Sequence, residues 1–340
     1  MIRVGVVGLG FMGKTHFNCY KSIHDVQVAA VCDVDEKKLK DPSGMAGNLA
    51  GAEKPLDFSG VELYTNYDEM LAKAKLDAVS ITLPTYMHAE HAIKALKKGL
   101  NVMCEKPMAL DVAQCKRMIS AMHKSGKILQ IGHCIRFWPE YVKAKEVIDS
   151  GEYGKVKAAS FRRLSSSPAW SWNNWMLAGN KSGGALMDLH IHDTDYVQYV
   201  FGLPKSVWTR GVFGPSGKLD HITTHYLYGT NDMVITAEGG CIMAPSFGFE
   251  MSFNIILERA TIAYDCTRHV PFRICLGKGE PLVPDIDKRS GHALELIHFI
   301  KRLKGEPVAE VLTPEDSLHS IKLILAEERS AITGKEIKIK

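Results

Sequence analysis

The sequence predicts a two-domain α/β protein, and three observations support this prediction. Its 340 residues are more than one hydrophobic core usually organises. Up to Ile131, short β-branched runs alternate with longer stretches of helical period, which is typical of a parallel sheet wound with helices. Beyond Ile131 most segments have the period of strands. We therefore expect a first domain over 1–132 and, over 133–340, an α+β domain with a large, mostly antiparallel open sheet.

In the first domain, six segments have the β-branched composition of buried parallel strands. They are Ile2–Val7, Val26–Cys32, Val61–Tyr64, Ala78–Thr82, Asn101–Cys104 and Ile128–Ile131. The segments between them have helical period: Gly13–Ser22, Glu36–Ala50, Tyr67–Ala74, Met87–Lys98 and Ala113–Ser125. The glycines and prolines of Lys40–Gly60 predict a partial surface excursion there.

In the second domain, a helix over Glu140–Ser150 precedes a strand over Lys155–Leu164, and another helix opens near Leu186. Strand-like segments then alternate from Val207 to Tyr264. Apolar residues at three- and four-residue spacing predict two closing helices, over His292–Lys304 and Pro314–Ser330.

Composition and charge exclude several classes of protein. Apolar residues make up 46% and charged residues 24%, the balance of an ordinary globular protein. The net charge is only +4 and the signs alternate along the chain, so nucleic acid is not an expected partner. The eight cysteines form no Cys-x-x-Cys pair, which favours reduced core residues. Glycines interrupt the apolar start and no apolar run is long enough to cross a bilayer, so we expect a cytoplasmic protein without a membrane partner.

A glycine triad, Gly8, Gly10 and Gly13, follows the first strand directly and precedes a helix. In a dinucleotide-binding domain the first glycine allows the tight turn, the second leaves room for the pyrophosphate, and the third lets helix and strand pack closely. The phosphates then meet the positive end of the helix. The triad in this context predicts a Rossmann-type domain with a dinucleotide cofactor.

Asp33 ends the second strand, 20 residues beyond Gly13. A carboxylate there can accept hydrogen bonds from the adenosine ribose hydroxyls and would repel a 2′-phosphate. No basic residue follows until Lys37. We therefore predict NAD as the cofactor, in preference to NADP.

Two further stretches carry a resemblance to a known family. They are Cys104-Glu105-Lys106-Pro107, after the fifth strand, and Gly183-Gly184-Ala185-Leu186-Met187-Asp188-Leu189-His190-Ile191-His192-Asp193, in the second domain. Thr82-Leu83-Pro84-Thr85-Tyr86-Met87-His88 and Arg136-Phe137-Trp138-Pro139 match the same pattern in order. The chain as a whole resembles the Gfo/Idh/MocA oxidoreductases, which include glucose-fructose oxidoreductase and inositol dehydrogenase.

The resemblance implies a site in the cleft between the domains. It places Lys106 beside the nicotinamide and the substrate hydroxyl and makes His192 the base that takes the hydroxyl proton. Asp188 then either holds that hydroxyl or orients the site. The resemblance adds further contacts to the cofactor and the substrate. The cofactor contacts are Gly8, Gly10, Phe11, Met12, Gly13, Asp33, Thr82, Pro84, His88, Glu105, Lys106 and Arg136, and the substrate contacts are Lys106, Arg136, Trp175, Asp188 and His192.

Elementary chemistry agrees with these roles but leaves alternatives open. A lysine at the carboxyl end of a parallel strand can polarise a carbonyl or stabilise an alkoxide, or it can be a solvated side chain before a proline turn. Asp188 and His192 are four residues apart, so on a helix they project from one face. The alternative is that Asp188 caps the helix and His192 packs inside the domain. For His88 and Glu105, surface or helix-capping roles are the alternatives.

Histidines at short spacing could be taken for metal ligands, but the sequence predicts no metal site. The candidates are His190, His192, Asp193, His221 and His225, and no cysteine or glutamate completes a standard ligand set with them. Many members of the family have a small residue at the position of His190, so its imidazole either stands near the substrate or turns away from it.

An aromatic and amide-rich loop, with Trp170, Trp172 and Trp175 beside Asn173 and Asn174, precedes the glycine run. Aromatic faces with amides suit a carbohydrate, although interdomain packing explains such a loop equally well. The family often has Trp-Arg where this chain has Trp175-Met176, which argues mildly against a charged sugar acid. Arg136, Arg162 or Arg163 could supply the charge instead.

The function we predict is NAD-dependent oxidation of a secondary alcohol on a sugar, inositol or related polyol by a homodimer or homotetramer. One rival is a redox-neutral glycosidase or epimerase-like enzyme that retains NAD. Another is a non-catalytic ligand sensor, against which the presence of Lys106, Asp188 and His192 argues.

Overall fold

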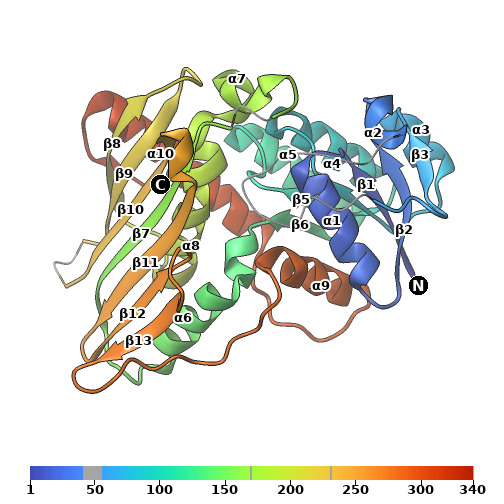
Figure 1. Cartoon of the computed structure of the whole chain (residues 1–340). Coiled ribbons are helices and arrows are strands. Elements are labelled where there is room, and N and C mark those ends of the chain that lie inside the picture. Colours follow the sequence, from blue (N-terminus) through green and yellow to red (C-terminus); the bar gives the residue numbers. More distant parts are fainter. Residues whose placement is uncertain (41–55, 169–170, 230–231, 340) are drawn as a thin grey trace. The chain divides into compact units, whose positions relative to one another are not determined.

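The computed structural model describes residues 1–40, 56–168, 171–229 and 232–339, which form two compact units (Figure 1). The first unit contains the described residues up to 134 together with 171–175 and 292–318. The second contains 135–168, the described part of 176–291, and 319–339. Each unit has its own sheet.

The sheet of the first unit has six parallel strands in the order β3-β2-β1-β4-β5-β6. They are β1 (Ile2–Val7), β2 (Val26–Cys32), β3 (Glu62–Tyr64), β4 (Ala78–Ile81), β5 (Asn101–Glu105) and β6 (Leu129–Gly132). This is the strand order of dinucleotide-binding folds, in which the chain reverses direction across the sheet after β3. The predicted Rossmann architecture is confirmed.

Helices connect these parallel strands, because a parallel pair requires a crossover. They are α1 (Phe11–Ser22), α2 (Glu36–Lys40), α3 (Tyr67–Lys73), η1 (Thr85–Met87), α4 (His88–Lys97) and α5 (Val112–Ser125). Side chains of Asn66 and Asp111 cap α3 and α5 by accepting hydrogen bonds from Glu69 N and Gln114 N. The predicted helix over Glu36–Ala50 is described only as far as Lys40, and most of the predicted surface excursion lies outside the described residues.

Helix α9 (Gly291–Leu303) packs in the first unit, although the sequence predicts that everything after residue 132 belongs to the second domain. Leu296, Phe299 and Ile300 on α9 join the buried cluster of Val4 and Phe17, and all five side chains are at most 2% exposed. The apolar face of α9 therefore completes a core that the first 134 residues leave open. Position along the sequence could not reveal which sheet this face covers.

The sheet of the second unit has eight strands in the order β13-β12-β11-β7-β10-β9-β8-β14. They are β7 (Val156–Ser166), β8 (Ser206–Phe213), β9 (Leu219–Leu227), β10 (Val234–Met243), β11 (Phe249–Leu257), β12 (Ala260–Asp265), β13 (Phe272–Leu276) and β14 (Ile337–Lys338). Only the pair β7 and β10 is parallel, and the remaining pairs are antiparallel. The prediction of a large, mostly antiparallel sheet is confirmed.

Helices α8 (Ile191–Phe201) and α10 (Pro314–Thr333) lie along one face of this sheet, with α6 (Pro139–Ser150) near its end (Figure 1). Tyr141 on α6, Tyr196 on α8 and Phe253 on β11 are buried, and the Tyr141 ring packs edge-on against each of the other two with centroids 4.8 Å away. On the strands, buried and exposed residues alternate: Trp208 is 37% and Ile256 46% exposed, whereas Val207 and Ile255 are fully buried. One face of the sheet therefore forms the core.

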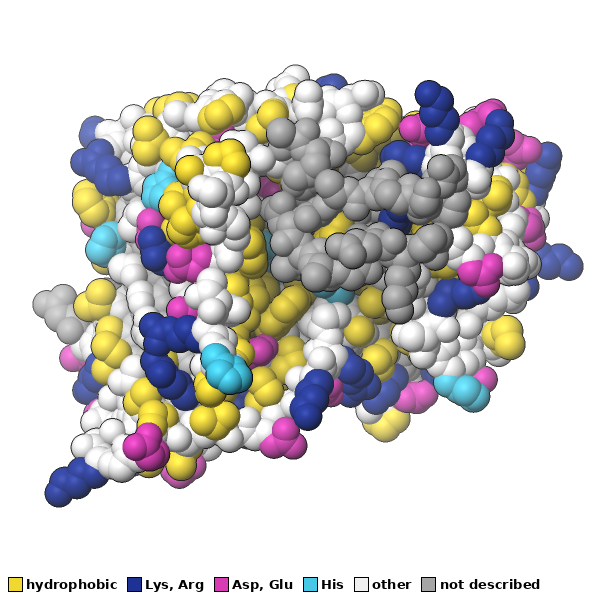
Figure 2. Space-filling view, in the orientation of Figure 1, with side chains coloured by type: hydrophobic (Ala, Val, Ile, Leu, Met, Phe, Trp, Pro, Cys, Tyr) yellow, Lys and Arg dark blue, Asp and Glu magenta, His cyan; other side chains and the backbone are white. Residues whose placement is uncertain are grey.

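The surface displays no concentration of one charge on the face that Figure 2 draws, where Lys and Arg side chains are interspersed with Asp and Glu. None of the helices in the described ranges is both long and apolar enough to span a bilayer.

Candidate active site

The glycine turn after β1 has the geometry that a dinucleotide requires. Gly8 has a φ of +93°, and its N–H donates to Cys32 O at 2.8 Å. A Cβ on Gly13 would stand 1.8 Å from Gly8 O, so only glycine allows α1 to begin so close to the turn. The hydroxyl of Thr82 donates to Val7 O and Gly8 O at 3.0 and 2.7 Å, which holds the turn against the end of β4.

Gly10 supplies the space for a ligand. It precedes α1, no side chain caps the helix there, and no described atom lies within 4 Å of the place that a Cβ on Gly10 would occupy. The N-terminus of α1, at Phe11 and Met12, lies next to this space. A diphosphate fits such a space, because the N–H groups of a helix N-terminus and the helix dipole both favour an anion.

Asp33 lies at the end of β2, where the ribose of an adenosine is expected. Its side chain is 6% exposed and accepts hydrogen bonds from Leu9 N at 2.7 Å and Asp35 N at 2.9 Å. Lys38 Nζ lies 3.2 Å from its Oδ2. The sequence indicated no basic residue beside this carboxylate. The first turn of α2 places the ammonium of Lys38 there.

The predicted contact His88 is buried, not exposed. Its Nδ1 lies 2.8 Å from Pro107 O and its Nε2 2.8 Å from Leu83 O, so the imidazole connects the loop after β4 to the loop after β5. Pro84 stands just before η1 in the first of these loops. The predicted contacts of His88 and Pro84 with the cofactor stay predictions.

Glu105 and Lys106 follow one another at the end of β5. The carboxylate of Glu105 is buried, lies 2.9 Å from His16 Nε2 on α1, and accepts a hydrogen bond from Lys106 N at 3.2 Å. Burial raises the pKa of Glu105, but the hydrogen bond and charge of His16 outweigh it, so the pKa lies below its usual value. Lys106 itself is only partly buried at the carboxyl edge of the sheet.

In the second unit, a pair of glycines begins the helical segment that carries Asp188 and His192. Gly183 and Gly184 have φ values of +80° and +71°. The carboxylate of Asp220, on β9, accepts a hydrogen bond from Ala185 N at 3.2 Å and thereby caps the segment. The sequence left open whether Asp188 provides this cap, and Asp220 does so.

Asp188 lies in a single π-helical turn, η4 (Leu186–His190), which continues directly into α8. Asp188 and His192 are both partly exposed, whereas Met187, His190 and Asp193 beside them are buried. Single π-turns occur frequently at functional sites. The predicted catalytic pair is thus partly exposed within its own unit, and its catalytic role stays a prediction.

His190 turns away from that pair. It is fully buried, and its Nε2 lies 3.0 Å from Oε2 of Glu327 on α10. On the other side a Cβ on Gly239 of β10 would stand 2.7 Å from its Nδ1, so the glycine makes room for the ring. The structure decides between the two positions that the sequence allowed, and His190 belongs to the core of the second unit.

The three arginines that could have neutralised a charged substrate are engaged with carboxylates. Arg136 forms a buried bidentate pair with Asp195, at 2.8 and 2.9 Å, and Arg163 forms one with Asp193, at 3.0 Å for both contacts. Arg162 pairs with Glu238 and Glu250. The predicted contact of Arg136 with cofactor and substrate stays a prediction, and its buried ion pair is the structural role that the sequence did not indicate.

The remaining predicted residues are Trp175 and the histidines His221 and His225. Trp175 is partly exposed in η3 (Trp172–Leu177), while Trp170 lies outside the described residues. His221 Nε2 is 3.1 Å from Glu238 Oε1, and the His225 ring stacks near Trp208. His190, His221 and His225 therefore contact different partners and do not converge on one point.

Comparison with known proteins decides the family. Residues 2–133 match the model of an oxidoreductase family with an NAD-binding Rossmann fold, and residues 141–263 match a GFO/IDH/MocA C-terminal domain. The inositol 2-dehydrogenase/D-chiro-inositol 3-dehydrogenase of Lactiplantibacillus plantarum is 36% identical over 313 residues, which cover 88% of this chain and 83% of that one. The chain belongs to the Gfo/Idh/MocA family.

Two further relatives widen the comparison. The D-glucoside 3-dehydrogenase of Escherichia coli is 26% identical over 99% of this chain and 97% of its own. The crystal structure of the WlbA dehydrogenase from Bordetella pertussis, in complex with NADH and UDP-GlcNAcA, superimposes with a TM-score of 0.81 over 100% of this chain and 98% of that one. At 22% identity this last likeness shows the fold alone.

As a Gfo/Idh/MocA protein, the chain is a dehydrogenase that acts on CH–OH groups of sugars or polyols with NAD as cofactor. The open space at Gly10 and the carboxylate of Asp33 fit that cofactor. Sequence reasoning missed one residue that shapes the site: His16, three residues after Gly13 on the inward side of α1, which holds Glu105 directly before Lys106. The available signal was a histidine directly before the apolar Phe17, in the helix that follows the glycine triad.

Proposed function

We propose that this enzyme oxidises a secondary hydroxyl of an uncharged cyclic polyol, with inositols as the first candidates. The observation that carries the proposal is the pairing of Arg136, Arg162 and Arg163 with carboxylates. A buried bidentate pair is costly to break, because removing one partner leaves an uncompensated charge. Arg136 and Arg163 are therefore poor anchors for a sugar acid, and the more exposed Arg162 is shared between Glu238 and Glu250. The identity to an inositol dehydrogenase supports the same substrate class.

In this proposal Lys106, Asp188 and His192 act on one hydroxyl. His192 accepts the hydroxyl proton as the carbinol carbon is oxidised, for which an imidazole with a pKa near neutrality is suited. Asp188 accepts a hydrogen bond that orients the hydroxyl, and the ammonium of Lys106 stabilises the negative charge that develops on the oxygen. Bound NAD supplies the acceptor for the hydride.

Trp175 and Arg136 complete the proposed set. Trp175 offers a ring face against which the C–H face of a cyclic polyol can stack. For Arg136 we propose a contact with the cofactor or the substrate that leaves its pair with Asp195 in place.

The test is an assay of NAD reduction with a matched panel of substrates. It comprises myo-, scyllo- and D-chiro-inositol, glucose and methyl glucoside, and the corresponding uronic acids, with NADH absorbance as the readout. We expect kcat/KM to be highest for an inositol and at least about 10-fold lower for the uronic acid than for the neutral sugar of the same ring, because Arg136, Arg162 and Arg163 are each paired with a carboxylate.

Two outcomes would contradict the proposal. A preference for the uronic acid would show that one of the paired arginines is displaced to bind it. Turnover of a sugar without any change in NADH absorbance, by protein that purifies with bound NAD, would instead establish the redox-neutral rival.

We also propose that the protein is a homodimer or homotetramer. The exposed apolar side chains on the outer face of the second sheet, including Trp208, Val234 and Ile256, support this proposal. Light scattering coupled to size exclusion measures the mass in solution, and a monomer at micromolar concentration would refute it.

A further inference from the structure

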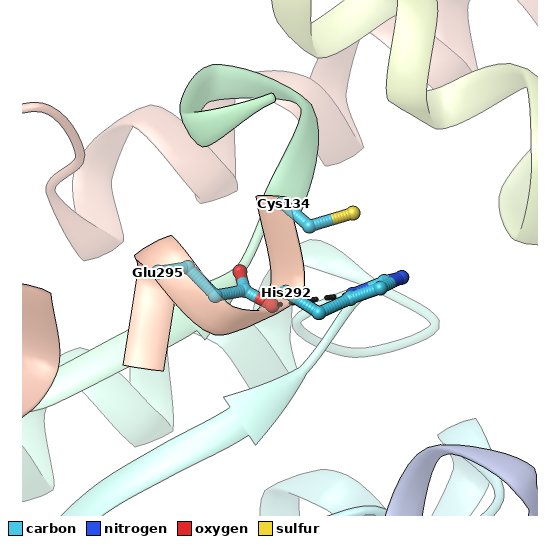
Figure 3. A group of neighbouring side chains, drawn as sticks. All are labelled: Cys134, His292 and Glu295. Carbon is cyan, nitrogen blue, oxygen red and sulfur yellow. Dashed lines mark ion pairs between the residues drawn. The ribbon is translucent and has the colours of Figure 1, made fainter. Parts of the chain in front are cut away.

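A group of three side chains from distant parts of the sequence meets at the edge of the first sheet (Figure 3). Cys134 follows β6 directly, whereas His292 and Glu295 lie three residues apart on the first turns of α9. One ligand atom from each residue lies within 4.8 Å of those of the other two. Figure 3 shows the Cys134 thiol and the His292 ring projecting the same way, with the Glu295 carboxylate directed at the ring.

Glu295 has a carboxylate that the surrounding protein does not satisfy. Its side chain is 0% exposed, and neither carboxylate oxygen has a hydrogen-bond partner among the described residues. The nearest cationic group is His292, whose Nδ1 lies 3.6 Å from Oε1, too far for a hydrogen bond. A buried carboxylate without donors is unfavourable unless it takes up a proton or a cation.

The distance between the His292 imidazole and the Glu295 carboxylate suits a cation bound by both better than a direct hydrogen bond between them. Tetrahedral zinc binds nitrogen and oxygen at about 2.0–2.2 Å and sulfur at about 2.3 Å, which puts neighbouring ligand atoms about 3.3–3.7 Å apart. The 3.6 Å between His292 Nδ1 and Glu295 Oε1 falls in this range. The ligand atoms of all three residues lie within 4.8 Å of one another, so a small rotation of the Cys134 side chain is enough to bring the thiol into the same coordination shell.

A second group of potential metal ligands in the first unit is less suitable for a cation. His16, Glu105 and Glu295 also lie within 4.8 Å of one another. In that group both nitrogens of His16 are already engaged, with Ser80 Oγ at 2.7 Å and Glu105 Oε1 at 2.9 Å. Glu105 nevertheless matters, because its negative charge beside Glu295 increases the need for a cation there.

We propose that Cys134, His292 and Glu295 form a site for a thiophilic divalent cation of the zinc type, with water as the fourth ligand. Thiolate, imidazole and carboxylate are the three ligand types that zinc prefers. The cation would join the start of α9 to the end of β6. It therefore stabilises the contact through which Leu296 and Phe299 complete the first core.

The test uses Zn²⁺ and Co²⁺ as probes on the full-length protein. The protein is stripped with a chelator and titrated with each metal; bound zinc is measured by mass spectrometry, and cobalt by its absorption. We expect a single equivalent per chain, cobalt bands of a tetrahedral site with a near-ultraviolet thiolate-to-cobalt transition, and a lower melting temperature after chelation.

Variants identify the ligands. Cys134→Ser removes the thiolate transition and weakens cobalt binding by about 10²-fold or more, and Glu295→Gln weakens it without removing the transition. The matched control is Cys19→Ser, which alters a partly buried cysteine of the same unit and leaves the spectrum unchanged. Circular dichroism checks that each variant is folded.

Three results would overturn the proposal. They are substoichiometric binding to the wild type, a wild-type cobalt spectrum without the thiolate transition, and a Cys134→Ser spectrum equal to that of the wild type. The first two need no variant, so a misfolded variant leaves the test intact. None of these results bears on which alcohol the enzyme oxidises.

Discussion

Asp188 and His192 differ in burial from the polar residues that follow them on the same helical segment. Asp193, Thr194 and Asp195 are fully buried and bound to Arg163, Glu327 and Arg136. Asp188 and His192 keep part of their surface exposed on the same helical segment. The polar residues that stabilise this segment are thus buried and paired. The two residues that we assign to catalysis are partly exposed.

Removing the proposed ammonium or base should impair turnover but not cofactor binding. We expect Lys106→Ala and His192→Ala each to lower kcat by roughly 10²–10⁴-fold, because each removes a group that acts on the reacting hydroxyl. Steady-state kinetics measures kcat, and calorimetry measures the Kd for NAD. Lys98→Ala and His123→Ala, which alter exposed side chains, are the controls. Near-normal kcat in both active-site variants would refute the assigned roles.

Asp33 should determine the preference for NAD over NADP. Replacing it by serine removes the charge that repels a 2′-phosphate and frees Lys38, now 3.2 Å from Asp33, to pair with that phosphate. We expect the ratio of kcat/KM for NAD to that for NADP to fall by about 10-fold or more in Asp33→Ser. Asp35→Ser is the control, because Asp35 caps a local turn through Lys37 N. An unchanged ratio would mean that Asp33 has only the structural contacts with Leu9 N, Asp35 N and Lys38.

At the scale of elements, two glycine turns position the proposed site. The turn between β1 and α1 places the N-terminus of α1 beside an open space, and the turn before η4 lets the segment with Asp188 begin against Asp220. The glycines of the first turn have different tasks. Gly13 allows helix and strand to approach, whereas Gly10 leaves room for a ligand.

Alanine substitutions should separate these two tasks. Gly10 has extended backbone that alanine can adopt and free space around its Cβ position, so Gly10→Ala should change the free energy of unfolding by less than about 0.5 kcal/mol. The added methyl should weaken NAD binding by about 10-fold or more, because it takes up the space of the pyrophosphate. Gly13→Ala should instead cost about 1–3 kcal/mol of stability.

Urea unfolding and calorimetric NAD titration measure the two effects. If Gly10→Ala bound NAD as tightly as the wild type, the cofactor phosphates could not lie over this turn.

At the scale of the whole molecule, chain order and structural unit do not coincide. The first unit is completed by residues from after position 291, because α9 carries the apolar side chains that cover α1 and β1. The stability of the NAD-binding unit therefore depends on α9, which follows most of the second unit in the sequence.

This dependence predicts a large effect of a single substitution in α9. Phe299 is 0% exposed, so Phe299→Ala should lower the free energy of unfolding by about 3–5 kcal/mol. Ile332→Ala on α10, where the side chain is 61% exposed, should change it by less than about 0.5 kcal/mol. Differential scanning calorimetry with and without NAD identifies the transition that NAD raises, and the Phe299 effect should fall on that transition. An effect confined to the other transition would contradict the assignment of α9.

Several features of this protein follow from the sequence alone. The alternation of strands and helices, the glycine triad after β1 and Asp33 at the end of β2 were sufficient to predict the parallel sheet and NAD, because they depend on local backbone geometry and on short spacing. The same holds for the glycines before Asp188, whose positive φ values need no distant partner.

Tertiary structure decided what depends on contacts between distant residues. It paired Arg136 with Asp195, directed His190 at Glu327, and placed α9 against β1. It also assembled Cys134, His292 and Glu295, which are separated by up to 161 residues in the chain. A buried polar group must find its partner wherever the packed core provides one, and no local pattern in the sequence records where that is.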